Sequence, residues 1–174
     1  MEPSSSELQP TWGHYFLIYA IVTIFWFLLV GSLKKDAVIA GLAVGAIITV
    51  LMIPRLSILA GVRLSFGAPL ALLRYLITFI VALVQSNFDM ARRVLSPSLP
   101  IRPGLVEIRT KLESPIGKLL LANSITLTPG TLTVDVVDER IMVHWIDCPP
   151  GGTVDDRTRA IADSFERVLR GFVK

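Results

Sequence analysis

The chain has 174 residues, of which 52% are hydrophobic and 18% are charged, and its formal net charge is +3. A soluble globular domain is usually about 45–50% apolar and about 25% charged, so this composition predicts a membrane protein. It argues against a disordered chain and against an ordinary secreted domain. The single cysteine, Cys148, excludes an intrachain disulfide.

The charged residues are unevenly divided along the chain. Residues 1–90 hold nine of them and residues 91–174 hold the other 22. A membrane half joined to a polar half is therefore expected. The basic residues do not gather into a patch interleaved with aromatic residues, so nucleic acid is not predicted as a partner.

The membrane half, residues 1–93, is predicted to contain three short transmembrane helices, over about 15–33, 37–53 and 70–88. A helix of nineteen residues covers roughly the 30 Å hydrocarbon core at about 1.5 Å per residue. The first apolar run follows Glu2 and Glu7, and no basic residue precedes Lys34. This differs from the basic start of a secretory signal peptide, so the run is interpreted as a retained span.

The second apolar run contains Gly41 and Gly45 in a G-x-x-x-G spacing. In lipid, this spacing lets a neighbouring helix approach closely, either within the chain or from a partner subunit. The alternative is that glycine is simply common in membrane helices. An acidic residue deep inside a span would indicate an ion path, but Asp36 and Asp89 both lie at the ends of predicted spans.

The flanking Lys and Arg residues predict the orientation of the three spans. The N-terminal segment and the 54–69 loop share one side of the membrane and hold two basic residues, Arg55 and Arg63. The other side holds seven: Lys34, Lys35, Arg92, Arg93, Arg102, Arg109 and Lys111. This bias predicts an outside N-terminus and a cytoplasmic C-terminal half. The turn at 33–36 is short, so the first two runs could also form a hairpin of tilted or incomplete spans.

A Pro-rich linker over 94–104 is expected to lead into a small α+β domain over 105–174. The alternation of apolar and charged residues over 105–112 predicts a strand. Ser114 and Pro115 begin a helix, and Asp138-Glu139 joins two strands of a hairpin. Thr153 and Asp156 form a capping box before the last helix. The order β-α-β-β-α fits a split ferredoxin-like sandwich, whose missing fourth strand would leave a sheet edge for a partner.

The polar half shows no recognisable catalytic or metal-binding pattern. His144, Asp147 and Cys148 have mixed ligand character, but their spacing matches no common zinc site. Residues 128–131 (TPGT) lack the glycine run and lysine of a phosphate loop and are interpreted as a turn. Asp155-Asp156 is interpreted as the acidic first turn of a helix. No catalytic, cofactor-binding or metal-binding residue is predicted, and the chain is not expected to be an enzyme.

Residues 120–136 (LLANSITLTPGTLTVDV) resemble the signature of the MrpE/MnhE family, one of the subunit families of the multisubunit Na+/H+ antiporters of bacteria, the Mrp or Mnh type. The hairpin ending at residues 144–147, and the order of short spans before a small cytoplasmic domain, resemble the same family. The specific part is the ANSITLTPGT run, residues 122–131.

This resemblance implies a non-catalytic accessory or assembly subunit of a monovalent cation/proton antiporter in the cell membrane. Its partners would be the other membrane subunits, of which the large ones are thought to hold the ion paths. The alternative is a membrane-anchored cytoplasmic binding or sensor module outside any transporter.

The family motif is interpreted as a structural junction that ends a helix and fixes the turn into the hairpin. Asn, Ser and Thr side chains readily bond nearby backbone groups. The residues assigned to this junction are Asn123, Ser124, Thr126, Thr128, Pro129, Gly130 and Thr131.

Overall fold

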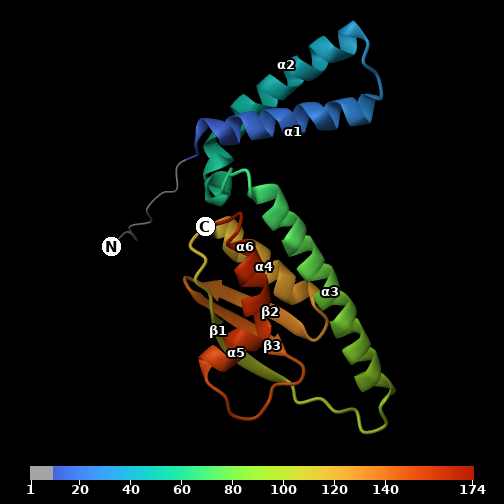
Figure 1. Cartoon of the computed structure of the whole chain (residues 1–174), viewed down its shortest axis with the longest axis vertical. Coiled ribbons are helices and arrows are strands. Elements are labelled where there is room, and N and C mark those ends of the chain that lie inside the picture. The colour runs from blue at the N-terminus through green and yellow to red at the C-terminus, as the bar shows by residue number, and fades with distance from the viewer. Residues whose placement is uncertain (1–9) are drawn as a thin grey trace. The chain divides into compact units, whose positions relative to one another are not determined.

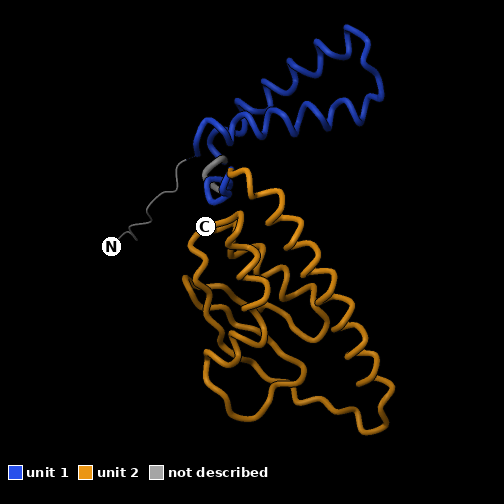
Figure 2. The backbone as a smooth tube through the Cα atoms, in the orientation of Figure 1, with its two compact units in different colours: residues 1–64 blue, residues 65–174 orange. Residues whose placement is uncertain are grey.

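A computed structural model describes residues 10–174, apart from the side chains of residues 56–58. Glu2 and Glu7, used above in the interpretation of the first span, lie outside the described residues. The chain forms two compact units, residues 1–64 and residues 65–174 (Figure 2). The second unit joins the third apolar helix to the α+β domain.

The first unit is a helical hairpin followed by a short 3-10 segment. Its elements are α1 (Trp12–Val30), α2 (Lys35–Met52) and η1 (Ile53–Gly61). Helix α1 ends at Gly31, whose φ of 61° is favourable for glycine and whose N–H donates to the carbonyl of Phe27 at 3.0 Å. Trp26 Nε1 donates to the carbonyl of Ala37 at 3.0 Å. This bond joins the end of α1 to the start of α2.

The second unit begins with helix α3 (Ala68–Leu95) and continues into the α+β domain (Figure 1). The domain elements, in chain order, are β1 (Gly104–Arg109), α4 (Pro115–Leu127), β2 (Thr131–Val137), β3 (Arg140–Trp145), α5 (Val154–Ile161) and α6 (Asp163–Leu169). The strands form an antiparallel sheet in the order β1-β3-β2. The predicted arrangement of three apolar helices before a small α+β domain is therefore confirmed.

The local start signals of the domain helices act as predicted. Ser114 caps α4, because its Oγ accepts a hydrogen bond from Gly117 N at 3.2 Å. Thr153 and Asp156 form the capping box of α5, with Asp156 N donating to Thr153 Oγ1 at 3.2 Å and Thr153 N to Asp156 Oδ2 at 3.0 Å. These short-range bonds satisfy amides that a helix leaves open at its start.

The core of the domain lies on the face of the sheet that the helices cover. The fully buried side chains there include Ile108, Leu121, Ile125, Ile141, Val143 and Leu169. The apolar residues Leu132, Val134 and Val136 of β2 remain substantially exposed. A register shift between Thr133 and Asp135 interrupts the alternation of β2, so Leu132 pairs with exposed His144 whereas Val136 pairs with buried Ile141. The even apolar spacing therefore does not place these residues on one face.

Three details of the domain differ from the prediction. The last helix is two, α5 and α6, interrupted at buried Ala162 because α5 packs on β1 while α6 packs on α3. The first strand ends at Arg109, after which Lys111 N donates to Glu166 Oε1 at 3.0 Å. The segment predicted as a linker is fixed at Arg102, whose N–H donates to the carbonyl of Ile146 at 2.9 Å.

Candidate functional site at the junction of α3 and the small domain

The family motif lies where α4 ends and β2 begins, and its hydroxyl groups close that turn. Thr128 Oγ1 donates to the carbonyl of Ser124 at 2.8 Å. Thr131 Oγ1 donates to the carbonyls of Ile125 at 2.7 Å and Thr128 at 3.0 Å. These carbonyls belong to the last turn of α4 and its C-cap, where the regular bonds of the helix end. Those of Ile125 and Thr128 also accept backbone bonds, from Thr128 N and Thr131 N, both at 3.2 Å. The side chains of the motif thus end the helix.

A second set of bonds holds α4 against β2. Thr133 N donates to Thr126 Oγ1 at 3.1 Å, and Thr133 Oγ1 donates to the carbonyl of Ala122 at 3.0 Å. Asn123 is exposed on the surface of α4. Within the motif, Thr126 therefore faces the adjoining strand, while Asn123 is available to solvent or to another chain.

Gly130 occupies a position at which a side chain would be strained and crowded. Its φ is +98°, a conformation that glycine adopts far more readily than other residues. A Cβ there would lie 3.1 Å from Ile146 Cγ2 and 3.3 Å from Met90 Cε. The Gly130 carbonyl also accepts a hydrogen bond from Ile146 N at 2.8 Å. The turn therefore fits closely against both β3 and α3.

The motif is joined directly to α3 through a buried serine. Ser124 Oγ lies 2.9 Å from Tyr75 Oη, and it also donates to the carbonyl of Leu120 at 2.7 Å. The Tyr75 ring lies 5.8 Å from the ring of Phe172, between centroids. One turn further along α3, Phe79 lies 6.5 Å from Phe165 of α6. These aromatic contacts attach the middle of α3 to the domain.

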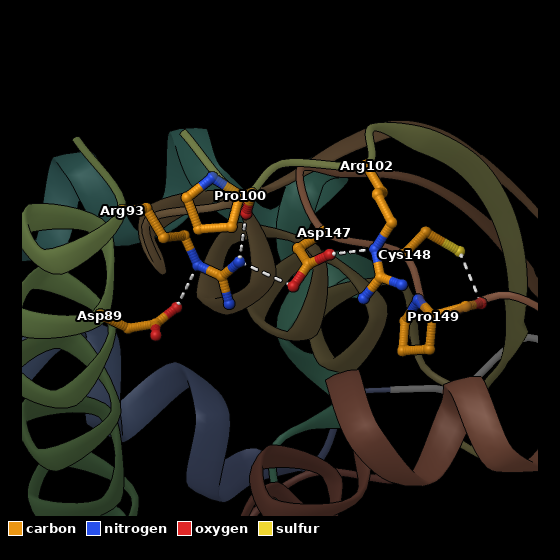
Figure 3. A network of polar contacts seen from close by, with 7 residues as sticks. All are labelled: Asp89, Arg93, Pro100, Arg102, Asp147, Cys148 and Pro149. Atoms are coloured by element: carbon orange, nitrogen blue, oxygen red, sulfur yellow. Dashed lines mark hydrogen bonds and ion pairs between the residues drawn. The ribbon is translucent and has the colours of Figure 1, made fainter. Parts of the chain in front are cut away.

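An ionic network attaches the end of α3 to the end of β3 (Figure 3). Arg93 Nε bonds Asp89 Oδ2 at 2.7 Å, and Arg93 Nη1 bonds Asp147 Oδ2 at 2.6 Å. Arg93 Nη1 also donates to the carbonyl of Pro100 at 2.8 Å. Arg102 Nε bonds Asp147 Oδ1 at 3.0 Å. Hydrogen bonds from Arg93 and Arg102 hold the pKa of the Asp147 carboxyl below its usual value.

The residues considered as a mixed ligand group do not converge. Asp147 is occupied by Arg93 and Arg102. His144 lies exposed in β3, paired in register with Leu105 and Leu132, and Cys148 Sγ donates to the carbonyl of its neighbour Pro149 at 3.6 Å. Among residues 10–174, no group of three His, Cys, Asp or Glu side chains is placed to hold a metal ion.

The predicted packing glycines lie inside the first unit. A Cβ at Gly41 would lie 2.5 Å from Trp26 Cδ1, and one at Gly45 would lie 2.6 Å from Thr23 Oγ1. Both glycines are buried where α2 faces α1. Of the two surfaces that such a spacing can serve, these contacts favour packing within the chain.

The residues of α3 that contact the domain were not predicted from the sequence. Tyr75, Phe79 and Ser86 recur at intervals of four and seven residues and share one face of α3 with Arg93. Asp89 stands four residues before Arg93, a spacing that favours an ion pair within a helix. The distant partners of this face, in α4, α6 and β3, are not visible from spacing alone. A shallow pocket between α3 and the 128–131 turn is lined by residues that include Ser86, Met90, Pro129 and Phe165.

These features define a class: a membrane protein in which apolar helices carry a small α+β domain, with the motif-bearing turn fixed to the last of those helices. By length and composition, three of the described helices could cross a membrane.

Comparison with known proteins gives the family. Residues 19–171 match the family model MNHE, described as a Na+/H+ ion antiporter subunit. The chain belongs to this family. It is 29% identical over 152 residues to the E1 subunit of the Na(+)/H(+) antiporter of Staphylococcus aureus (strain bovine RF122 / ET3-1), covering 86% of this chain and 91% of that protein.

Two further relatives extend this finding. The E-type subunit of the Na(+)/H(+) antiporter of Alkalihalophilus pseudofirmus is 39% identical over 101 residues, which is 57% of this chain and 62% of that protein. A chain of the membrane-bound sulfane sulfur reductase, an archaeal respiratory membrane complex, has a similar structure with a TM-score of 0.75 and 36% sequence identity. The match covers 90% of this chain and 97% of that chain.

Proposed function

We propose that this chain is an accessory, non-catalytic subunit of a multisubunit Na+/H+ antiporter, and that it assists assembly rather than ion movement. The observation that carries the proposal is the position of charge along the apolar helices. Helix α1 contains no charged residue, and the charges of α2 are confined to Lys35 and Asp36 at its start. The charges of α3 lie toward its two ends, at Arg74 and at Asp89, Arg92 and Arg93. Ion and proton paths through membranes depend on ionisable groups inside the spans.

The relatives support a role that is more general than cation exchange. Two of them are named as antiporter subunits, and a third comes from a complex named for sulfur reduction. A fold that serves both kinds of complex supplies something they share. A structural part of a common membrane assembly satisfies this requirement.

The junction between α3 and the domain is consistent with this role. Its hydroxyl groups and glycine are used in ending α4 and holding the 128–131 turn. We infer that the domain faces the cytoplasm, as the basic residues that surround it predict. The partners are the other membrane subunits, and the exposed apolar residues of β2 offer one surface for them.

Purification in mild detergent tests the proposal against the alternative of a free-standing sensor module. The tagged full-length chain, expressed from its own genome, is expected to co-purify with several very hydrophobic subunits. Membranes that lack the chain are expected to contain less assembled antiporter, and re-expression should restore it. A monodisperse single chain with normal antiporter levels would support the sensor module instead.

A further inference from the structure

Helix α3 presents two different faces along its whole length. Ala71, Tyr75, Phe79 and Arg93 mark the face that packs on the domain. The opposite face carries large apolar residues that are about half exposed or more: Leu73, Ile77, Ile80, Val84 and Phe88. The helix thus separates the folded domain from an uncovered apolar surface.

The part of α3 that contacts the domain is about as long as the hydrocarbon core of a bilayer is thick. The contacts run from Ala71, which a Cβ on Gly171 would approach to 2.6 Å, to Arg93 beside Asp147. At about 1.5 Å per residue this distance along α3 is roughly 33 Å, against roughly 30 Å of hydrocarbon. If α3 crossed the membrane, the domain would lie beside it inside the hydrocarbon.

The domain is chemically unsuited to that position. Its α6 helix, which packs on α3, carries Asp163, Glu166 and Arg167, with Arg170 directly after it. The sheet has three strands, so β1 and β2 have open edges. Charged side chains and unpaired strand edges are both avoided in contact with lipid tails. The domain therefore excludes a crossing orientation of the helix to which it is bound.

The exposed face of α3 instead has the pattern of a helix that lies in a membrane surface. Arg74 and Arg92 are exposed and stand 18 residues apart, which is five helical turns, so they occupy one line along the helix. This line borders the apolar face. A helix with an apolar face and basic residues at its margin inserts partway into a leaflet, and its arginines reach the phosphate groups.

We propose that α3 lies in the cytoplasmic leaflet of the bilayer and attaches the α+β domain to it, and that only α1 and α2 cross. The connection between α2 and α3 spans residues 53–67, which keeps α3 tethered to the membrane. This proposal replaces the three-span orientation predicted from sequence, and it does not depend on the proposed function.

Two crossings also satisfy the distribution of basic residues. Lys34 and Lys35 then lie outside. Eight basic residues up to position 111 lie on the cytoplasmic side: Arg55, Arg63, Arg74, Arg92, Arg93, Arg102, Arg109 and Lys111. This bias is as strong as that of the three-span arrangement. The N-terminus is then cytoplasmic.

Spin-label depth measurements test the position of α3. In a Cys148→Ser background, single cysteines replace Leu73, Ile77, Ile80, Val84 and Phe88 in the full-length chain within its complex in lipid vesicles. All five labels are expected at a similar shallow depth, in contact with lipid-soluble oxygen. Ile24→Cys on α1 serves as a deep control and Glu139→Cys as an aqueous control.

Two results would overturn the proposal. Labels whose depth passes from one surface through the bilayer centre to the other would show a crossing helix. Labels shielded from both oxygen and water would show that another subunit, rather than lipid, covers this face.

Thiol labelling gives a second measurement that leaves α3 unchanged. In intact cells, a membrane-impermeant maleimide is expected to react with Leu33→Cys and not with Ser65→Cys, both in the Cys148→Ser background. Opening the cells should make Ser65→Cys reactive. The opposite pattern in intact cells, Ser65→Cys reactive and Leu33→Cys protected, would restore the three-span arrangement.

Discussion

Tyr75 and Ser124, 49 residues apart in the chain, bring their hydroxyl oxygens to 2.9 Å and so join α3 to the family motif. We expect Tyr75→Phe to remove this bond while keeping the ring packing against Phe172. The cost is about 1 kcal/mol, which corresponds to roughly fivefold faster hydrogen exchange of the α4 amides in the assembled protein.

Tyr15→Phe is the matched control for that exchange measurement. It removes the same hydroxyl from a tyrosine in the other unit and should leave α4 exchange unchanged. If Tyr75→Phe also leaves it unchanged, the bond does not stabilise the junction.

Because the pKa of Asp147 is lowered, the attachment of the end of α3 to the end of β3 is sensitive to acid. A carboxyl whose folded pKa lies below its unfolded pKa stabilises the folded state above the unfolded pKa, and this stabilisation is lost as pH falls through the folded pKa. The spacing between spin labels at Ala91→Cys and Glu139→Cys in a Cys148→Ser background should therefore stay constant from neutral pH to about 5 and broaden below about 4.

Substitutions at two aspartates identify the source of that acid response. Asp147→Asn should broaden the label spacing already at neutral pH, because both Arg93 and Arg102 lose their shared carboxylate. Asp163→Asn, which removes an exposed partner of Arg167 on α6, should leave the profile unchanged. An unaltered profile in Asp147→Asn would assign the response to another group.

Gly171 permits close approach of the C-terminal segment to the start of α3. A Cβ there would lie 2.6 Å from Ala71 Cβ, so Gly171→Ala should destabilise the second unit by about 1–3 kcal/mol. Thermal unfolding of the purified protein in detergent measures this loss. Gly67→Ala is the control, because its Cβ would meet only Ser65 Oγ at 3.9 Å.

In the first unit, Gly41 permits a similarly close approach of α2 to α1. Gly41→Val places carbon atoms where Trp26 now lies, and a Cβ alone would approach Trp26 Cδ1 to 2.5 Å. We expect weaker packing of α1 on α2, seen as a lower thermal unfolding midpoint in detergent. Ala43→Val on the exposed side of α2 should leave that midpoint unchanged, and equal losses in both variants would indicate an effect of bulk rather than of helix packing.

The parts of the fold that could be predicted from sequence rest on short-range signals. Ser114 and Pro115 mark the start of α4, Thr153 and Asp156 mark the start of α5, and Gly130 marks the turn into β2. Each of these acts within a few residues of itself, so its meaning does not depend on the rest of the chain.

The missed features depend on contacts between distant residues. The last helix is interrupted at Ala162 because its two parts pack on different elements. The Tyr75 side of the junction lacked a sequence signal for its partner, since the partner lies in α4. The hydropathy of α3 predicts a membrane span, and the helix is long and apolar enough to cross; the proposal that it lies in one leaflet rests on its packing against the domain, which hydropathy does not contain.

The central claim is that the motif serves structure and assembly rather than ion movement, and Thr128→Ala combined with Pro129→Ala tests it most directly. The measurement is Na+/H+ exchange in membrane vesicles, normalised to the amount of assembled complex in the same vesicles. We predict that assembly falls, because the Thr128 bond to Ser124 and the preset turn are lost, and that exchange per assembled complex stays unchanged. Full assembly with exchange abolished would contradict the claim.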